Sequence, residues 1–186
     1  MDKFDIYKKQ ISSFAPKDRI FIDETGSVMN LATNYGRAPS YERVHDYKPV
    51  SRGKRINTIG AVSESGLLSA ISIEGTFNSY IFSWFVEHFL VPHLSKQKVV
   101  IMDNSQIHMD IEALELIEQT GATIAFLPPY APEMNPIEHC WSVLKNHLRK
   151  AKARTVDTLY DAIEQGIKLI TPQLTKACCQ HCQSYT

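Results

Sequence analysis

The sequence predicts one α/β domain, with five strands in a single sheet that is flanked by helices. Apolar runs of strand length alternate with segments of helical periodicity, in the order strand, hairpin, helix, strand, helix, strand and helix. The size is also suitable, because 186 residues with 44% hydrophobic content can form one core but not two comfortable domains. We expect the domain at 19–172, after a linker or short helix at 1–18 and before a tail at 173–186.

Composition excludes some classes of protein. The chain has 20 basic and 20 acidic side chains, so its net charge alone does not indicate a nucleic-acid partner, and the distribution of charge matters more. No window approaches the roughly eighteen apolar residues of a membrane span, and no signal-peptide pattern follows the charged start at 1–5. We therefore expect a cytoplasmic protein with no membrane partner.

The first strand, expected at 19–26, contains two acids near its end. An acid in a buried strand is costly unless it is paired or bound to a metal, so Asp23 is a candidate ligand. The alternative is that Asp23 only caps the loop after the strand. Glu24 would point to the other side of a regular strand, and we leave it out of the candidate site.

A long polar loop is expected at 27–54, and a loop of this length in a compact domain is usually functional or disordered. Six basic residues and two acids lie between 37 and 55, which favours contact with phosphates over a merely solvated loop. The basic residues are Arg37, Arg43, Lys48, Arg52, Lys54 and Arg55, and the acids are Glu42 and Asp46.

The middle of the chain continues the alternation of strands and helices. Strands at 56–62 and 67–73 are joined by a short connection that contains Gly66, which favours a hairpin. Asn78 can cap a helix that ends near Pro92, and the aromatic residues of this helix share one stripe and so belong to the core.

A second acid, Asp103, lies at the end of the apolar strand expected at 98–104. The next helix is expected from about 107 to 119, and its acids, which include Asp110, fit a solvated face. A strand at 123–127 then leads into a proline-rich loop.

The stretch 126–138 joins this strand to an amphipathic helix through a stiff turn. Asn135 is a good N-cap, Pro136 suits the first helical position, and Glu138 falls at the third. On one interpretation Glu138 only forms a capping box with the backbone of Asn135. On the other, the rigid loop aims Glu138 at a site that it shares with other acids.

The helix that begins near 136 has one apolar face and one charged face. The face that carries Glu138 continues as a row of cations at helical spacing. This row favours a polyanion that lies across the helix with its scissile bond near Glu138. The cations are Lys145, Arg149 and Lys152, and a further helix is expected at about 155–170.

Asp23, Asp103 and Glu138 would repel one another if they converged without partners. A pair of divalent cations would remove this repulsion, and oxygen-only ligands favour Mg²⁺ or Mn²⁺ over zinc. Two such ions about 4 Å apart can activate the attacking oxygen and stabilise the leaving one in a phosphoryl transfer. No covalent nucleophile is then required.

The four cysteines suggest a different metal site. Three of them lie with His181 in the last nine residues, and Cys140 is distant in sequence. Structural zinc normally needs two ligand pairs on separate arms, so we interpret the cysteines as reduced cytosolic thiols. The three near the C-terminus are Cys178, Cys179 and Cys182.

The motifs around the three acids resemble those of DDE transposases of the mariner superfamily, and the bacterial insertion-sequence branch most closely. The resemblance rests on Asp23 in 22–24, Asp103 in 102–108 and Glu138 in 130–138, with 34 residues between the last two acids. It extends from about residue 14 to 185, and 181–185 is similar to the usual ending of that branch.

The resemblance implies an RNase H-like fold with a mixed five-stranded sheet, and two Mg²⁺ or Mn²⁺ ions. Asp23 would bridge both ions, and Asp103 and Glu138 would each hold one side. Such an enzyme hydrolyses a DNA strand at the transposon end, and the freed 3′-OH attacks target DNA, typically at a TA dinucleotide. Asn104, His108 and Asn135 would support the site, the first two by ordering the loop around Asp103.

The expected partner is double-stranded DNA, from the transposon ends and the target, with a homodimer allowed, in the nucleoid of a bacterium. Relatives usually carry an N-terminal helix-turn-helix region that recognises these ends. We expect that region on a separate or frameshifted reading frame. Two alternatives stay open: an RNase H-like nuclease for other substrates, which the proline loop and the spacing disfavour, and a non-catalytic DNA-binding remnant, which the three intact acids disfavour.

Overall fold

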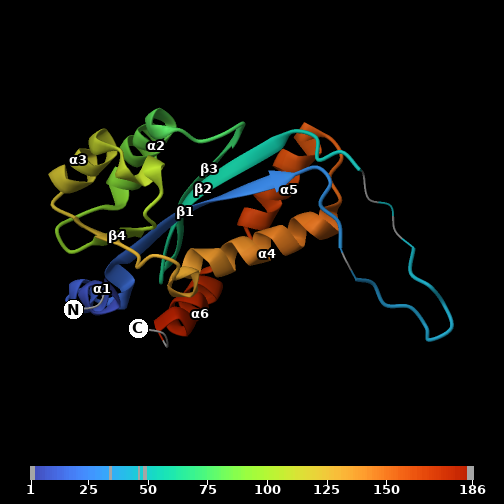
Figure 1. Ribbon diagram of the computed structural model, residues 1–186, viewed down its shortest axis with the longest axis horizontal. Coiled ribbons are helices and arrows are strands. Elements are labelled where there is room, and N and C mark those ends of the chain that lie inside the picture. The colour runs from blue at the N-terminus through green and yellow to red at the C-terminus, as the bar shows by residue number, and fades with distance from the viewer. Residues whose placement is uncertain (1–2, 34, 46, 48–49, 184–186) are drawn as a thin grey trace.

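A computed structural model of the protein, which describes residues 3–33, 35–45, 47 and 50–183, shows a mixed five-stranded sheet (Figure 1). The strand order is β3-β2-β1-β4-β5. β1 is antiparallel to β2 and β2 to β3, whereas β1, β4 and β5 run parallel. This confirms the predicted sheet. The strands are β1 (Arg19–Val28), β2 (Arg55–Ser63), β3 (Gly66–Glu74), β4 (Val99–Met102) and β5 (Thr123–Phe126).

Six α-helices in the described part of the chain cover the sheet. They are α1 (Lys3–Ser12), α2 (Ser79–Phe85), α3 (Ile111–Gln119), α4 (Pro136–Ala151), α5 (Val156–Ile167) and α6 (Pro172–Gln183). A wider π-helical turn at Val86–Leu90 continues α2, and short 3-10 turns lie at Pro16–Asp18, Val91–His93, Gln106–Met109 and Pro132–Met134. Over the described residues, no helix combines the length and apolar character needed to cross a bilayer.

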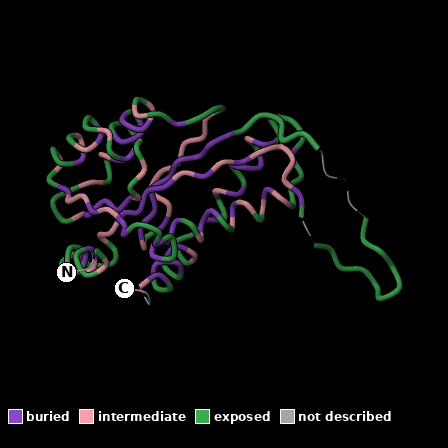
Figure 2. Tube along the Cα trace, viewed as in Figure 1, coloured by how far each residue is buried: buried purple, intermediate pink, exposed green. Residues whose placement is uncertain are grey.

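The strands divide the apolar side chains between two cores, because successive residues of a strand point to opposite faces. On β1, Phe21 packs with α1, α4, α5 and α6, whereas Ile20 and Ile22 pack on the other face with α2 and α3. Figure 2 shows the buried residues along the strands and the inner sides of the helices. The central strands are therefore covered on both faces, as parallel strands usually are.

The long loop between β1 and β2 leaves the body of the protein (Figure 1), and its residues 35–45 are all exposed. Its base is fixed, because Nη1 of Arg154 donates to the carbonyl oxygens of Met29 at 3.0 Å and Leu31 at 3.3 Å. Asp46 and Lys48, which contributed to the predicted charge of this loop, lie outside the described residues.

Several predicted element boundaries are wrong, and two of them concern acids. The first strand does not end after its acids but continues to Val28, because β2 pairs with it from Phe21 to Val28. The helix expected from about 107 begins at Ile111, because Asp110 caps it: Oδ1 of Asp110 accepts from the backbone N–H of Ala113 at 3.2 Å and from the Ser83 hydroxyl at 2.6 Å. Asp110 therefore belongs to a cap and not to a solvated face.

Both ends of the described chain pack on the core. The segment expected to be a tail forms α6, because its cysteines act as small apolar side chains and are buried against α4. At the other end, Tyr7 and Ile11 of α1 are buried, and Nε2 of Gln10 donates to the carbonyl oxygen of Ile124 in the edge strand β5 at 2.7 Å. α1 is therefore the short helix of the prediction and not a free linker.

Helix α4 approaches the sheet closely at Gly60 of β2. A Cβ atom at position 60 would lie 2.8 Å from Cη2 of Trp141, which is fully buried on α4. Gly60 is the partner of Asp23 across the β1–β2 ladder, and Glu138 lies one helical turn before Trp141. The missing side chain at position 60 thus lets α4 bring Glu138 towards Asp23.

We predict that Gly60→Ala lowers the free energy of unfolding by about 1–3 kcal/mol, because a methyl group would overpack the contact with Trp141. Chemical denaturation followed by circular dichroism measures this change. The variant Gly60→Ala with Trp141→Phe should lose less stability than the two single variants added together, since phenylalanine vacates the contested space. Strictly additive losses would show that this contact does not limit the packing of α4.

Candidate active site

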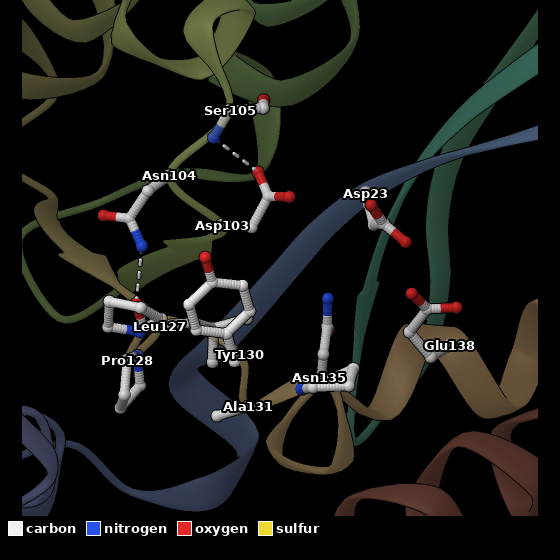
Figure 3. A pocket seen from close by; sticks show the side chains of 12 residues that line it. Asp23, Asp103, Asn104, Ser105, Leu127, Pro128, Tyr130, Ala131, Asn135 and Glu138 are labelled. Atoms are coloured by element: carbon white, nitrogen blue, oxygen red, sulfur yellow. Dashed lines mark hydrogen bonds between the residues drawn. The ribbon is translucent and has the colours of Figure 1, made fainter.

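The three acids expected from the sequence line one cavity of about 470 Å³ between the ends of β4 and β5 and the start of α4 (Figure 3). Parallel pairing explains how the first two meet. Phe21 of β1 is the partner of Ile101 of β4, so Asp23 and Asp103, each two residues further on, lie at the same level of the sheet. Glu138 joins them from the first turn of α4.

Asp23 lies within β1 and is only 9% exposed. Its Oδ2 atom is buried and has no hydrogen-bond partner among the described residues. Burial, and then the nearby carboxylate of Glu138, raise the pKa of Asp23 to about 7. Because Asp23 is inside the strand and its oxygen has no partner, it does not act as a cap for the loop after the strand.

Asp103 has the opposite environment. Its Oδ1 atom lies 2.6 Å from Nδ1 of His108 and accepts from the backbone N–H of Ser105 at 2.9 Å. The hydrogen bond from His108 outweighs partial burial and lowers the pKa of Asp103 to about 2. Asp103 is therefore ionised at neutral pH, whereas Asp23 is only partly ionised.

His108 lies at the centre of this arrangement and is fully buried. Its second ring nitrogen, Nε2, lies 3.1 Å from Oε1 of Glu24. Burial disfavours the charged ring, but the carboxylates of Asp103 and Glu24 outweigh burial and raise the pKa of His108 to about 9. A buried cation therefore sits between two acids.

Sequence reasoning missed Glu24, because strand alternation places it on the opposite face of β1 from Asp23. That placement is right as far as the strand is concerned, since Glu24 does not line the cavity. Its connection to the site runs through His108, which comes from a turn that is distant in sequence. The only signal in the sequence was that Glu24 directly follows a candidate ligand. The alternation of a strand cannot show which distant residue Glu24 contacts.

At the start of α4 the side chain of Asn135 makes no capping hydrogen bond, so no capping box holds Glu138. Glu138 is exposed in the first helical turn, and Figure 3 shows its carboxyl group and that of Asp23 facing the same space. Asn135 is itself buried, its Oδ1 atom has no partner among the described residues, and it lines the cavity. The second interpretation of this stretch, a loop that aims Glu138 at a shared site, agrees with this geometry.

The proline-rich loop forms one wall of the cavity and is fixed to the segment that carries Asp103. Nδ2 of Asn104 donates to the carbonyl oxygen of Leu127 at 2.7 Å, and the backbone N–H of Leu127 donates to the carbonyl oxygen of Met102 at 2.9 Å. Tyr130 in this loop is completely exposed and has a left-handed backbone with φ 59°, which is rare for a residue with a side chain. The loop therefore couples the end of β4 to the start of α4.

The predicted cations do not line the cavity. Lys145 and Arg149 are half-buried on α4, and Nη1 of Arg149 donates to Oδ1 of Asn146 at 2.8 Å. Lys152 ends the helix in a left-handed conformation, with φ 50°. Figure 1 shows the long loop between β1 and β2 extending away from the body of the protein, and none of its described cations lines the cavity.

The described cations of the long loop and of the start of β2 are exposed, and two of them contact neighbouring side chains. Arg37 and Arg52 are exposed, Nζ of Lys54 pairs with Oε1 of Glu74 at 2.8 Å, and Nε of Arg55 donates to Oδ1 of Asn57 at 2.8 Å. Across residues 3–33, 35–45, 47 and 50–183, no three Asp, Glu, His or Cys side chains are close enough to hold one ion as they stand, and this includes the cysteines of α6.

Comparison with known proteins shows which proteins the chain is similar to. The family described as DDE superfamily endonuclease matches residues 18–160. The Tcb1 transposase of Caenorhabditis briggsae is 23% identical over 122 residues, which are 63% of this chain and 45% of that protein. The chain thus spans about half the length of the relative that it matches.

Solved structures of Mos1 transposase share the fold. The Mos1 mariner paired-end complex with Mn has a TM-score of 0.77 at 11% identity, over 98% of this chain and 57% of that one. The Mos1 catalytic domain with raltegravir and Mg has a TM-score of 0.68 at 10% identity, over 96% and 87%. At these identities the likeness shows the fold alone, and the expected RNase H-like architecture is confirmed.

We predict that replacing Asp23 and replacing Asp103 have opposite effects on the free energy of unfolding in the absence of divalent metal. The pKa of Asp23 is higher in the fold than its ordinary value near 4, so ionisation destabilises the fold increasingly between about pH 4 and pH 7. Asp23→Asn should then raise the free energy of unfolding at pH 8 by up to about 4 kcal/mol, and have little effect near pH 4.

Asp103 is the matched control, because its pKa is depressed in the fold. It contributes stability above its ordinary pKa, and this contribution is lost as the pH falls towards 2. Asp103→Asn should therefore lower the free energy of unfolding at pH 8, as measured by denaturation in EDTA. Stability changes of the same sign in both variants would contradict the assigned environments.

Proposed function

Because the chain belongs to the DDE superfamily of endonucleases, we propose that it is the catalytic domain of a transposase that cuts DNA at transposon ends and joins their 3′ ends to target DNA. The observation that carries the proposal is the meeting of Asp23, Asp103 and Glu138 around one cavity. The three acids come from separate parts of the chain. The family match covers all of them.

The donor set fits Mg²⁺ or Mn²⁺, because it consists of carboxylates only. The buried, unpartnered Oδ2 atom of Asp23 supports a cation at this place, since an ionised oxygen without a partner is costly inside a protein. Mos1 transposase has been solved with Mn and with Mg. We propose that Asp23, Asp103 and Glu138 would together hold two such ions.

When bound, such ions activate the attacking oxygen and stabilise the leaving one. The residues of the chain prepare the site for them. His108 and Ser105 hold the carboxyl group of Asp103 in one orientation and keep it ionised. Glu138 lies in the first turn of α4, where the positive end of the helix dipole favours its negative charge. Water and the 3′-OH of DNA then serve as the nucleophiles, and no side chain forms a covalent bond.

The DNA lies across α4 in this proposal. Lys145 and Arg149 continue the face of the helix that begins with Glu138, so a phosphate backbone at the carboxylates can extend along them. Arg37, Arg52, Lys54 and Arg55 lie away from the cavity and would contact DNA beyond the cleaved bond. Lys54 also forms an ion pair with Glu74, and this contact would compete with a phosphate for its ammonium group.

Finer assignments belong to the same proposal. The resemblance of the motifs around Asp23, Asp103 and Glu138 supports the bacterial insertion-sequence branch, and the family resemblance implies a TA target, whereas the relative named above is from a nematode. Residues 184 and 185 of the branch-like ending lie outside the described residues. We also propose that the protein acts as a homodimer in the bacterial nucleoid, and that a helix-turn-helix part recognises the transposon ends. Mos1 transposase has been solved in a paired-end complex with a left transposon end.

We predict that Asp103→Asn reduces Mg²⁺-dependent cleavage and strand transfer to background, because the site loses a charged ligand. Transfer of pre-cut transposon ends, or nicking of supercoiled plasmid, measures the activity. Gel shifts and circular dichroism should show unchanged DNA affinity and a folded protein. Glu115→Ala, at an exposed position of α3, is the control and should remain active. An Asp103→Asn protein that still joined ends would refute the metal mechanism, and an inactive wild type would indicate a DNA-binding remnant.

We also predict that Lys145→Ala with Arg149→Ala weakens DNA binding and lowers the slope of log affinity against log salt concentration by about 2, or one per lost phosphate contact. Fluorescence anisotropy at several salt concentrations measures this slope. Lys17→Ala with Lys96→Ala is the matched control, because both lysines are exposed near the starts of the parallel strands, away from the cavity. Equal slopes for the two double variants would mean that the α4 face is only solvated.

A further inference from the structure

Glu24 and Asp23 are neighbours in β1, yet only Asp23 lines the cavity. Glu24 meets His108 instead, with Oε1 of Glu24 3.1 Å from Nε2 of the ring. The opposite ring nitrogen, Nδ1, is 2.6 Å from Oδ1 of Asp103. A continuous chain of contacts therefore runs from one acid of β1, through His108, to the acid that follows β4.

The ring of His108 has little freedom to leave this position. It is fully buried, and its centroid is 4.9 Å from that of Phe82 on α2. The short turn Gln106–Met109 that carries it is held at its far end, where Asp110 accepts from Ser83 of α2. Packing thus fixes the place of the imidazole, but it does not by itself fix the rotation of the ring about its Cβ–Cγ bond.

The contacts at the two nitrogens remove that remaining freedom. Oδ1 of Asp103 and Oε1 of Glu24 lie within hydrogen-bond distance of the two ring nitrogens, so each of these oxygens holds one side of the ring. If Glu24 were absent, Nε2 would lose the one hydrogen-bond partner that it has among the described residues, and with it the contact that holds the orientation of the ring. The direction of the Nδ1–H bond to Asp103 therefore depends on Glu24.

This bond decides how many oxygens Asp103 can offer to a metal. Its Oδ1 atom already accepts two hydrogen bonds, from His108 and from the backbone N–H of Ser105. Only Oδ2 is then available to the cavity. In Asp23, by contrast, no hydrogen bond from the described residues occupies the buried Oδ2 atom.

We propose that Glu24 is a positioning residue, which acts through His108 to hold the carboxyl group of Asp103 so that a single oxygen faces the bound divalent cation. This inference rests on the proposed metal-dependent function and deepens it. Glu24 does not itself touch DNA or metal. In metalloproteins, partners of the ligands commonly orient them in this way, and losing one costs about 10–100-fold in metal affinity or activity.

Isothermal titration of the metal-free protein with Mn²⁺ tests the proposal without DNA. Glu24→Ala should weaken Mn²⁺ binding by about 10–100-fold. Glu24→Gln keeps an oxygen that can accept from Nε2–H, so its affinity should lie between those of Glu24→Ala and the wild type. Glu115→Ala removes an exposed acid of α3 and should bind Mn²⁺ as the wild type does.

A second measurement separates positioning from a merely structural role. Nitrogen-15 NMR of the imidazole groups in the metal-free wild type should show both ring N–H protons of His108. Glu24→Ala should lose the Nε2–H signal and shift the Nδ1–H signal, while the thermal unfolding midpoint shows that the protein is folded. If Glu24→Ala does not fold, the same comparison is made with Glu24→Gln.

A folded Glu24→Ala protein with wild-type affinity for Mn²⁺ would overturn the proposal. So would a His108 ring whose two N–H signals are unchanged in that variant. The failure of the proposed function looks different: a wild type that neither nicks nor joins DNA, but whose Mn²⁺ affinity still depends on Glu24, refutes the transposase function and supports the positioning role.

Discussion

Mutual repulsion among carboxylates is the constraint on which the arrangement of this protein depends. Three acids lie around one cavity, and each of them has a different electrostatic environment. Asp103 is stabilised as an anion by a buried imidazolium, Glu138 lies at a helix start, and Asp23 has a raised pKa because burial and Glu138 both oppose its charge. A divalent cation at this cavity, where the strands, the proline-rich loop and α4 converge, would reduce the repulsion among the carboxylates and favour the ionised form of Asp23.

The rest of the structure holds this convergence in place. Parallel pairing of β1 with β4 sets Asp23 level with Asp103. Gly60 lets α4 approach the sheet, and the loop at 127–135 is tied to β4 through Asn104 and Met102. None of these contacts involves a charge in the site. They are contacts of packing and backbone, and they supply the rigidity that catalytic groups need.

Much of this could be predicted from the sequence, because the informative signals were local. Apolar runs that end in acids marked Asp23 and Asp103, and a proline-rich turn before an amphipathic helix marked Glu138. What escaped prediction depends on contacts between distant segments. Strand alternation placed Glu24 away from the cavity but could not show that His108 reaches it from the other face. Likewise, only the tertiary structure shows that Ser83 turns Asp110 into a cap, and that the cysteines of α6 face a core.

Helix α1 has a protective consequence for the molecule as a whole. β5 is a border strand of the sheet, and such strands invite pairing with the backbone of another molecule. The amide of Gln10 occupies one carbonyl of this border, and the helix covers the adjoining apolar surface with Tyr7 and Ile11. A shortened protein that started at β1 would keep the three acids of the cavity but leave the border strand β5 uncovered. It would therefore aggregate before its chemistry could be measured.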